Sequence, residues 1–537
     1  MEKIRNLFTN KYISALIAVI GTAAGIILCL HGEFSAFIKL MPPVLLLVAV
    51  SFLKHWLYPA AGAAICLVWI IAREGAGFDG YFYPQYLRVL IGGALLCTAN
   101  YVLFCAGAAR AAARFIAQKT KTRRGIITGA LAASLILSPV PEAAVAIGGS
   151  GFAYITRRLG ISREKLAFVV NAGAVLLAGS FFVSVWSGDV ASAVRTGLDL
   201  IGGELIDALA FMTTTVQYNF FAISMLVVLA MSTMQVRDMW PLLQTELAAR
   251  SAFDPKKFTA EEIPAAFMKK AAAAALIPNA AFAIVFAAAF VGAVRSSMTA
   301  SSAGSLGAVY YAVRHAAWGN VSLLAGGVAL ITALLGCAYL RVKHPEQKER
   351  NIPNANLPDL LMPAVWMLVS CMLIIAAAKN GTYAALAELI SANISSAFLP
   401  TLCFAAAFAV GLFSGNCSTS CMAVLPLAIP ACWNAMQEPA FYYTMGAGAV
   451  FAGALAGTLC APHAPLNIVA ALVSGCSPQR HMYTQIPYVL LCAVISCVFG
   501  YFPLSIGFGT TFGLFLVPVA TYALYDCLSK RPDRIKN

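Results

Sequence analysis

The chain has 537 residues, of which 61% are hydrophobic and only 11% are charged. This balance excludes an ordinary soluble domain and predicts a protein embedded in the lipid bilayer. The net charge of +14 does not indicate a nucleic-acid partner, because the basic residues stand at the ends of apolar runs.

Apolar runs close to the ~20 residues that span a bilayer recur along the whole chain. They lie at residues 12–31, 56–72, 87–108, 125–155, 166–186, 218–234, 271–294, 321–340, 360–378, 399–413, 445–474, 486–502 and 508–525, with 44–52 as a further crossing or half-crossing. The runs predict an all-α polytopic membrane protein with about 12–14 membrane segments, some of them re-entrant hairpins.

Two polar segments interrupt the apolar pattern, at residues 237–265 and 341–358. The first contains Asp238 and Glu246 among several bases and is interpreted as a solvated loop with a short helix. It divides the chain into an N-terminal transmembrane half, 1–250, and a C-terminal transmembrane half, 251–537.

Clusters of basic residues indicate how the chain is oriented. They are Lys3, Arg5 and Lys11 before the first run, the acid-free loop 110–124, and the last residues from Lys530 onward. Because positively charged loops stay on the cytoplasmic side, we expect an integral protein of the cytoplasmic membrane with its amino terminus inside the cell. The first run is too long for the core of a signal peptide and is expected to stay as a helix.

Two long apolar runs, one in each half, contain a proline-rich break. The breaks consist of Pro139, Pro141 and the adjacent Glu142 in the first half, and of Pro462, His463 and Pro465 in the second. Proline lacks a backbone donor and clashes with the preceding turn, so a helix does not continue through it. In lipid, such backbone is tolerated only inside protein or beside a wet cavity. Paired broken helices therefore predict a transporter's binding site in two repeat halves, whose relative orientation stays open.

A polar island separates the apolar runs 399–413 and 421–432. Its candidate pathway residues are Ser414, Asn416, Ser418, Thr419 and Ser420, with Gly415 allowing a sharp turn. At membrane depth this composition favours the tip of a re-entrant hairpin that faces a substrate or ion. The alternatives are a loop at the interface or a kinked helix whose hydroxyls bond back to its own carbonyls.

Several short motifs follow one another in the order found in a known family. They are Ile161–Asn171, which contains Arg-Glu-Lys-Leu-Ala, then Ser184–Trp186, Arg237–Pro241, Ser414–Ser420, Gly457–Asn467 and Ser474–Tyr488. Through these motifs the chain resembles the NhaC-type Na+/H+ antiporters of the ion-transporter superfamily. The resemblance implies a carrier fold and places Asn171, Ser184 and Asn467 along a substrate or ion pathway.

At several positions this chain lacks an acidic residue that the family carries. Thr458, Pro465 and Asn171 stand where the family motifs have carboxylates. Sodium is a hard cation and prefers charged oxygen ligands. We therefore predict a divergent member that holds no metal tightly. An organic solute, such as an anion or amino acid held by the N-termini of half-helices, is therefore favoured over a metal cation.

Glu142 and His463 are the candidates for carrying a coupling proton. Glu142 is the one acidic residue deep inside a long apolar run, and His463 stands in the other break. Burial raises the pKa of a carboxyl group and lowers that of histidine, so that a buried pair could exchange a proton near neutral pH. The alternatives are a headgroup-level or helix N-terminal carboxylate and a structural histidine.

We predict a secondary active transporter: an antiporter, coupled to a proton or another cation, that moves a small ion or organic solute by alternating access. No cofactor and no enzymatic activity are expected. Two alternatives stay open. One is a non-transporting receptor or assembly partner on a carrier scaffold. The other is an intramembrane enzyme that uses Cys460 with His463, or Ser418. A homodimer is compatible with the sequence.

Overall fold

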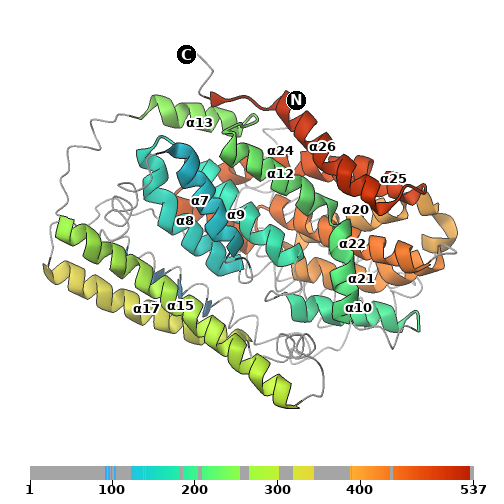
Figure 1. The fold of residues 1–537 in the computed structure, drawn as a ribbon, viewed down its shortest axis with the longest axis horizontal. Helices are drawn as coiled ribbons and strands as arrows, with labels where there is room; N and C mark the ends of the chain where they lie inside the picture. The colour runs from blue at the N-terminus through green and yellow to red at the C-terminus, as the bar shows by residue number, and fades with distance from the viewer. Residues whose placement is uncertain are drawn as a thin grey trace, which may run out of the picture.

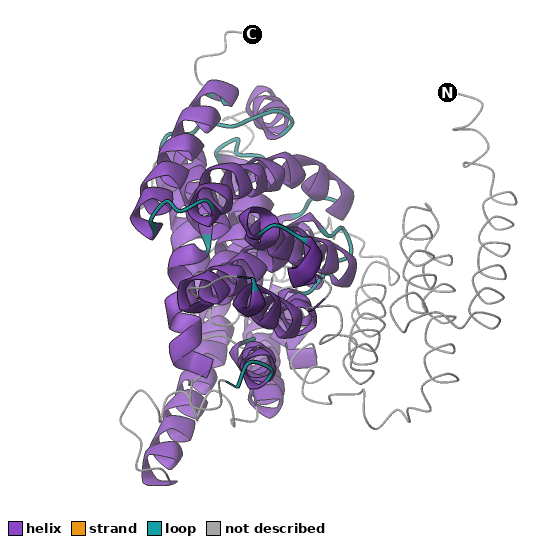
Figure 2. Cartoon of the chain, turned by 90° about the vertical axis from the view of Figure 1, so that its right-hand side faces the viewer, coloured by secondary structure: helices purple, strands orange, loops and turns teal. Residues whose placement is uncertain are grey.

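The computed structural model describes residues 122–136, 138, 141–180, 186–202, 208–253, 265–300, 318–343, 388, 390–435 and 439–532, with parts of 91–103. Within these residues the chain is helical, and extended pairing is limited to one bridge between Asp238 and Lys530. Figure 2 shows helices and short loops without a strand in the described part. The prediction of an all-α protein is confirmed.

Six of the described helices are long and apolar enough to cross a membrane, or seven if one bent pair forms a single span. The protein is therefore an integral membrane protein with several crossings. The predicted runs 12–31, 44–52, 56–72 and 360–378 lie outside the described residues. The predicted total number of segments stays a prediction.

The helices of the first half and of the segment that follows it are α7 (Arg123–Ile136), α8 (Pro141–Arg158), α9 (Arg163–Ser180), α10 (Ser187–Asp199), α11 (Ala208–Thr215), η2 (Val216–Tyr218), α12 (Phe220–Met234), α13 (Leu242–Ser251), α15 (Ala265–Ala300) and α17 (Trp318–Lys343). Those of the C-terminal part are α20 (Leu399–Ser414), α21 (Cys417–Asn434), α22 (Pro439–Cys460), α23 (Pro465–Ser474), α24 (Pro478–Ile495), the π-helical η5 (Ser496–Tyr501), α25 (Phe502–Ser505) and α26 (Thr510–Leu528). Figure 1 shows their arrangement.

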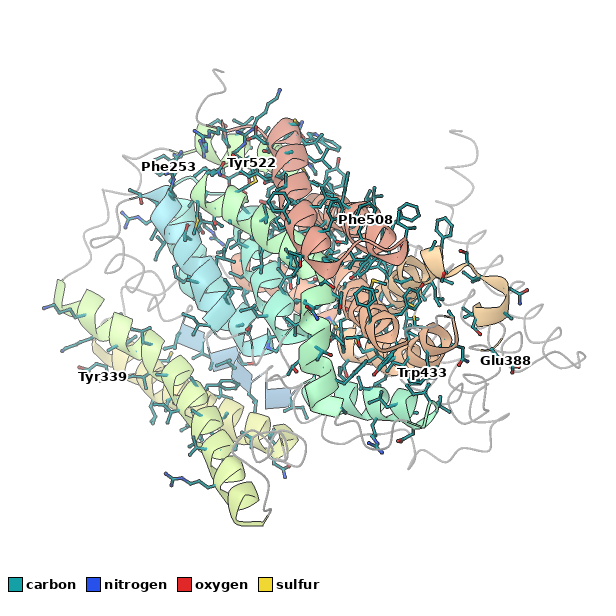
Figure 3. All side chains as sticks on the ribbon, turned by 45° about the vertical axis from the view of Figure 1, so that its right-hand side comes forward. Phe253, Tyr339, Glu388, Trp433, Phe508 and Tyr522 are labelled. Carbon is teal, nitrogen blue, oxygen red and sulfur yellow. The ribbon has the colours of Figure 1, made fainter. Side chains whose placement is uncertain are left out.

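The helix α22 lies in the middle of the main bundle. Its residues 442–460 are all buried, and the helix packs against α20, α21 and α24. A helix that is apolar on all sides is expected in such a position. By contrast, α15, α17 and α26 bury 29%, 33% and 22% of their apolar stretches, which leaves their outer faces for lipid. In Figure 3, Tyr339 of α17 and Tyr522 of α26 lie on this outer side.

Glycines let α20 and α22 approach each other closely. A Cβ added at Gly453 would lie 2.1 Å from the carbonyl oxygen of Phe404, and one at Gly457 would lie 2.2 Å from that of Phe408. Gly453 and Gly457 are four residues apart and share one face of α22. Small residues at this spacing are typical of tightly packed membrane helices. The packing fixes α20, and the turn after it, against the C-terminal half of α22.

The long helices α15 and α17 pack against each other beside the main bundle, as Figure 1 shows. Their shared core is built largely from alanines, including Ala271, Ala274 and Ala329, together with Phe282 and Leu340. This core is separate from the larger cluster around α9, α12 and α22. Every residue of the candidate site described below belongs to the main bundle.

Candidate functional site

The second predicted break separates α22 from α23. The helix α22 ends at Cys460 and α23 begins at Pro465, whose missing N–H costs nothing at the first helical position. Two side-chain amides satisfy the carbonyls that the break leaves free. Asn467 Nδ2 donates to the carbonyl oxygens of Thr458, at 3.0 Å, and Ala461, at 2.7 Å. The broken backbone is therefore stabilised by protein groups, as the membrane interior requires.

Four buried polar side chains meet beside this break: Asn171, Asn467, His481 and Gln485, here called the amide cluster. Gln485 Nε2 donates to the carbonyl oxygen of Leu459 at 2.6 Å. Asn171 Nδ2 donates to Asn467 Oδ1 at 2.6 Å and to Gln485 Oε1 at 3.1 Å. None of the four side chains is more than 1% exposed. The cluster joins α9, α23 and α24 to the end of α22.

Two atoms of the amide cluster have no hydrogen-bond partner within the described part of the chain. They are Asn171 Oδ1 and His481 Nδ1. The amide of Asn171 cannot simply be turned around, because its oxygen would then face the oxygens of Asn467 and Gln485. A buried polar group without a partner costs ~1–3 kcal/mol, and such groups are rare in native proteins. The amide cluster therefore provides hydrogen bonds to the backbone carbonyls at the break, while two of its own side-chain atoms stay without a partner in the described part of the chain.

The predicted polar island forms the turn between α20 and α21. Gly415 ends α20 with a φ of 64°, in the left-handed region that favours glycine. Asn416 caps α21 by accepting from the backbone N–H groups of Ser418 and Thr419. Ser414 Oγ donates to the carbonyl oxygen of Asn416 at 3.1 Å. The segment is thus the tight turn of a helical hairpin.

This turn touches the α22–α23 break. A Cβ added at Gly415 would lie 3.0 Å from Ala464 Cα and 3.1 Å from His463 Cδ2. His463 Nε2 lies 2.8 Å from the carbonyl oxygen of Phe413, so the imidazole must donate this hydrogen bond. Ser420, another predicted pathway residue, donates instead to the carbonyl oxygen of Ala407 within the hairpin. The structure therefore brings the island and the second break together.

The first predicted break falls between the end of α7 at Ile136 and the start of α8 at Pro141, and these two helices pack against each other. Pro141 begins α8 and is buried, and Glu142 is the next residue of that helix. Pro139 and Ser184 lie outside the described residues. The packing around the two breaks differs, because α8 packs on α7, the helix before it, whereas α23 packs mainly on α8, α9 and α24.

The helices α8 and α23, which begin at the two breaks, lie side by side. A Cβ added at Gly149 would overlap Val473, and one at Gly475 would overlap the guanidinium group of Arg157. Arg157 and Gly475 stand at the C-terminal ends of the two helices, which therefore run in the same direction. This arrangement brings the start of each helix to the same side of the bundle.

The sequence interpretation missed a further break, between η2 and α12. The axes of Phe211–Tyr218 and Phe220–Met234 differ by 53°. Asn219 caps α12 by accepting from the N–H of Ala222, and Tyr501 Oη donates to the carbonyl oxygen of Tyr218 at 2.8 Å. No proline marks this bend. The available signal was an asparagine immediately before an apolar run.

In the described part of the segment, residues 237–253, the predicted short helix is present as α13, but two of the acids expected in solvent are buried. Asp238 is fully buried, and its carboxylate lies 2.6 Å from the Nζ of Lys165, which is also buried. Ser232 Oγ donates to the same carboxylate at 2.8 Å. Glu246, 1% exposed, accepts from the backbone N–H of Ser162 at 2.7 Å. Buried polar and charged groups require such partners. Asp238 is the partner of the Lys165 side chain, and Glu246 is the partner of the Ser162 backbone N–H at the start of α9.

Glu246 belongs to α13, which is not among the helices able to cross a membrane. Burial raises the pKa of its carboxyl group; the positive charge of Lys165 opposes this effect and the negative charge of Asp238 adds to it. Lys165, Asp238 and Glu246 are here called the charged cluster. It connects the two family-like motifs Ile161–Asn171 and Arg237–Pro241.

His481 and Gln485 were also missed as site residues. Both lie in the family-like segment Ser474–Tyr488, to which no function was attached. His481 stands in the first turns of α24 and Gln485 follows one turn later on the same face. The available signal was their spacing: His481 and Gln485 are four residues apart among apolar neighbours, a pattern that indicates a polar stripe on one face of a buried helix.

Taken together, the helices define an integral membrane protein, and the amide cluster lies where α22 ends and α23 begins. Residues 351–503 match the Na+/H+ antiporter family. The match covers the α20–α21 turn, the α22–α23 break and three of the four amide-cluster residues. It supports a cation/proton antiporter, that is, a transporter rather than an enzyme.

A relative extends the comparison over nearly the whole chain. The chain is 23% identical over 529 residues to an "Uncharacterized protein" of Haemophilus influenzae, and the alignment covers 93% of this chain and 97% of the relative. The two proteins are therefore similar along their full lengths, including the first half, which the family match leaves out.

Proposed function

We propose that the protein is an NhaC-like antiporter of the cytoplasmic membrane that moves a small ion or organic solute by alternating access, coupled to protons. The observation that carries the proposal is the α22–α23 break. It lies within the matched family region, deep in the bundle, and the α20–α21 turn touches it. Broken helices of this kind are typical of the substrate and ion sites of secondary carriers.

The chemistry of the amide cluster supports a solute other than a tightly held sodium ion. Asn171, Asn467, His481 and Gln485 supply two amide donors to backbone carbonyls and no carboxylate. Dehydration of sodium is best compensated by charged oxygen ligands. A neutral cluster of donors and acceptors is better suited to a polar organic solute or to a proton.

Flux measurements in proteoliposomes test the proposal. The purified protein is reconstituted, and uptake of labelled sodium, an amino acid and a carboxylic acid is followed separately, with and without an imposed pH gradient. We expect accumulation of one probe only when the pH gradient is present. Asn171→Ala should reduce this accumulation, whereas Gln244→Ala, at an exposed amide of α13, should not. Absence of flux for every probe would favour the receptor alternative.

A further inference from the structure

From Arg480 onward, the exposed residues of α24 stand on one side of the helix. They are Arg480, Tyr483, Leu490 and Val494, and Val498 of η5 continues the row. Their spacings of three, four and seven residues place them on a single face. The four apolar members are between 45% and 58% exposed, and the helix belongs to a segment able to cross a membrane. This row, here called the α24 stripe, therefore faces lipid.

An aromatic pair stands at the end of the α24 stripe where the helix begins. The rings of Tyr483 and Trp240 meet edge to face, with centroids 5.7 Å apart, and the two side chains are 56% and 57% exposed. Trp240 lies in the loop between α12 and α13, outside the spanning helices. Exposed Trp and Tyr are typical of the boundary between lipid tails and headgroups. The pair places the headgroup level one turn below Arg480.

The arginines at this end converge on the turn between α23 and α24. Arg163 donates to the carbonyl oxygen of Gly475 at 2.7 Å, and the guanidinium group of Arg157 fills the space beside Gly475. Arg480 Nε lies 3.3 Å from Glu164 Oε1, with side chains 68% and 8% exposed. Among these residues, three arginines and one glutamate leave an excess of two positive charges. The helix α24 itself contains no acidic residue, so the charge beside the α24 stripe is positive.

The length of the α24 stripe matches one acyl chain. From Tyr483 to Val494 a helix rises ~16 Å, at ~1.5 Å per residue. This is close to half of the ~30 Å hydrocarbon core, which is the depth of a single leaflet. An apolar row of this length that ends in an aromatic pair and exposed positive charge fits a molecule with an acyl chain and an anionic head.

We propose that the α24 stripe and Arg480 bind an anionic phospholipid, with its phosphate at Arg480 and one acyl chain along the stripe. Charge complementarity commits the site to this occupant, because basic groups at the end of membrane helices attract anionic headgroups. The arginine fork also matches the geometry of a phosphate. Arg480 directly precedes His481, so the lipid would hold the first turns of the helix that contributes two members of the amide cluster.

Native mass spectrometry of the purified full-length protein tests this site by counting bound lipids. The probes are phosphatidylglycerol and phosphatidylcholine with the same palmitoyl and oleoyl chains, and glycerol 3-phosphate as a headgroup without chains. We expect the first phosphatidylglycerol to bind more tightly than the first phosphatidylcholine, and glycerol 3-phosphate not to displace it. Arg480→Gln should weaken phosphatidylglycerol binding about fivefold and leave phosphatidylcholine unchanged. Arg480→Lys, which retains the charge, should keep most of the preference.

Arg124→Gln is the matched control, since Arg124 is an exposed arginine that belongs to α7 instead of α24. It should leave both lipids unaffected. Tyr483→Ala keeps the contact between Arg480 and Glu164 and should weaken both lipids by removing a ring from the stripe.

Four results would overturn the inference. They are equal affinity for the two lipids, equal losses in Arg124→Gln and Arg480→Gln, unchanged binding in Tyr483→Ala, and displacement of the lipid by glycerol 3-phosphate. A lipid-free dimer would also overturn it, because a second copy would then cover the stripe. Transport is not measured in this experiment, so its outcome is independent of the proposed function.

Discussion

The buried ion pair between Lys165 and Asp238 allows a quantitative test of how the start of α9 is held. The Nζ–Oδ2 distance is 2.6 Å, and the two side chains are 2% and 0% exposed. Removing one partner of such a pair leaves a buried charge without compensation. The typical cost is ~3–5 kcal/mol of the free energy of unfolding. Lys165→Met removes the charge and keeps most of the side-chain volume, so the loss should fall in this range.

The double variant Lys165→Met/Asp238→Asn removes both charges at once. Replacing both members of a buried pair by neutral groups is often nearly neutral, and the amide oxygen introduced by Asp238→Asn can still accept from Ser232. We therefore expect the double variant to be more stable than Lys165→Met. The coupling energy from the complete cycle should reach about 2–3 kcal/mol, which is large for two contacting residues.

The matched control is the exposed pair Arg195–Asp199, whose atoms lie 2.9 Å apart and whose side chains are 34% and 49% exposed. Solvent screens such pairs, so Arg195→Met should cost less than about 1 kcal/mol. Unfolding free energies are measured by reversible denaturation in mixed detergent–dodecyl sulfate micelles. A loss of less than about 1 kcal/mol for Lys165→Met, or strict additivity in the cycle, would refute the reasoning about buried charge.

Three other outcomes follow from local features. Because folding raises the pKa of Glu246, the stability that this carboxyl contributes is complete below the ordinary glutamate pKa and is lost as the pH rises through the raised value. Glu246→Gln should abolish this loss in measurements of the melting temperature across pH. Gly453→Leu should prevent α20 from packing on α22 and abolish the monodisperse folded peak in size-exclusion chromatography, whereas Gly327→Leu, with open space around its Cβ, should be tolerated. Low millimolar sodium should not raise the melting temperature relative to choline at equal ionic strength. A rise that is specific to sodium and is lost in Asn171→Ala would contradict the prediction that the amide cluster does not bind sodium tightly.

The helical architecture could be predicted because its signals are local. The predicted apolar runs 271–294, 321–340 and 399–413 correspond to α15, α17 and α20, within a few residues at most ends. The proline at position 465 was predicted to interrupt a helix, and α23 begins at this residue. A residue without a backbone N–H fits the first turn of a helix. Length, apolarity and proline act within one segment, so the sequence alone displays them.

Contacts between distant segments could not be predicted in the same way. Asp238 lies in a segment rich in charges, and such a composition ordinarily indicates solvent exposure. Its burial depends on Lys165, 73 residues earlier in the chain. Gln485 likewise gains significance only from its hydrogen bond with Asn171, 314 residues away. Neither pairing leaves a periodic or compositional signal in the local sequence.

The resemblance to the antiporter motifs identified two candidate site residues that the apolar periodicity of the sequence does not reveal. Asn171 and Asn467 were predicted as pathway residues from two separate motifs, and the structure places their amides 2.6 Å apart. Their contact supports a shared function on chemical grounds, while the pathway itself stays a prediction. The motifs that the chain resembles carry carboxylates where this sequence has Asn171, Thr458 and Pro465. The resemblance therefore predicts a neutral hydrogen-bonded cluster in place of a charged one.

Glu142 provides the last prediction, because its proposed part in proton coupling is separable from that of His463. Glu142→Gln keeps the size of the side chain and most of its hydrogen-bonding capacity while removing ionisation. If Glu142 carries the coupling proton, flux driven by a pH gradient should vanish, while exchange of solute across the membrane persists. A Glu142→Gln protein with unaltered proton coupling would exclude this carboxyl and leave His463, at the α22–α23 break, as the remaining candidate.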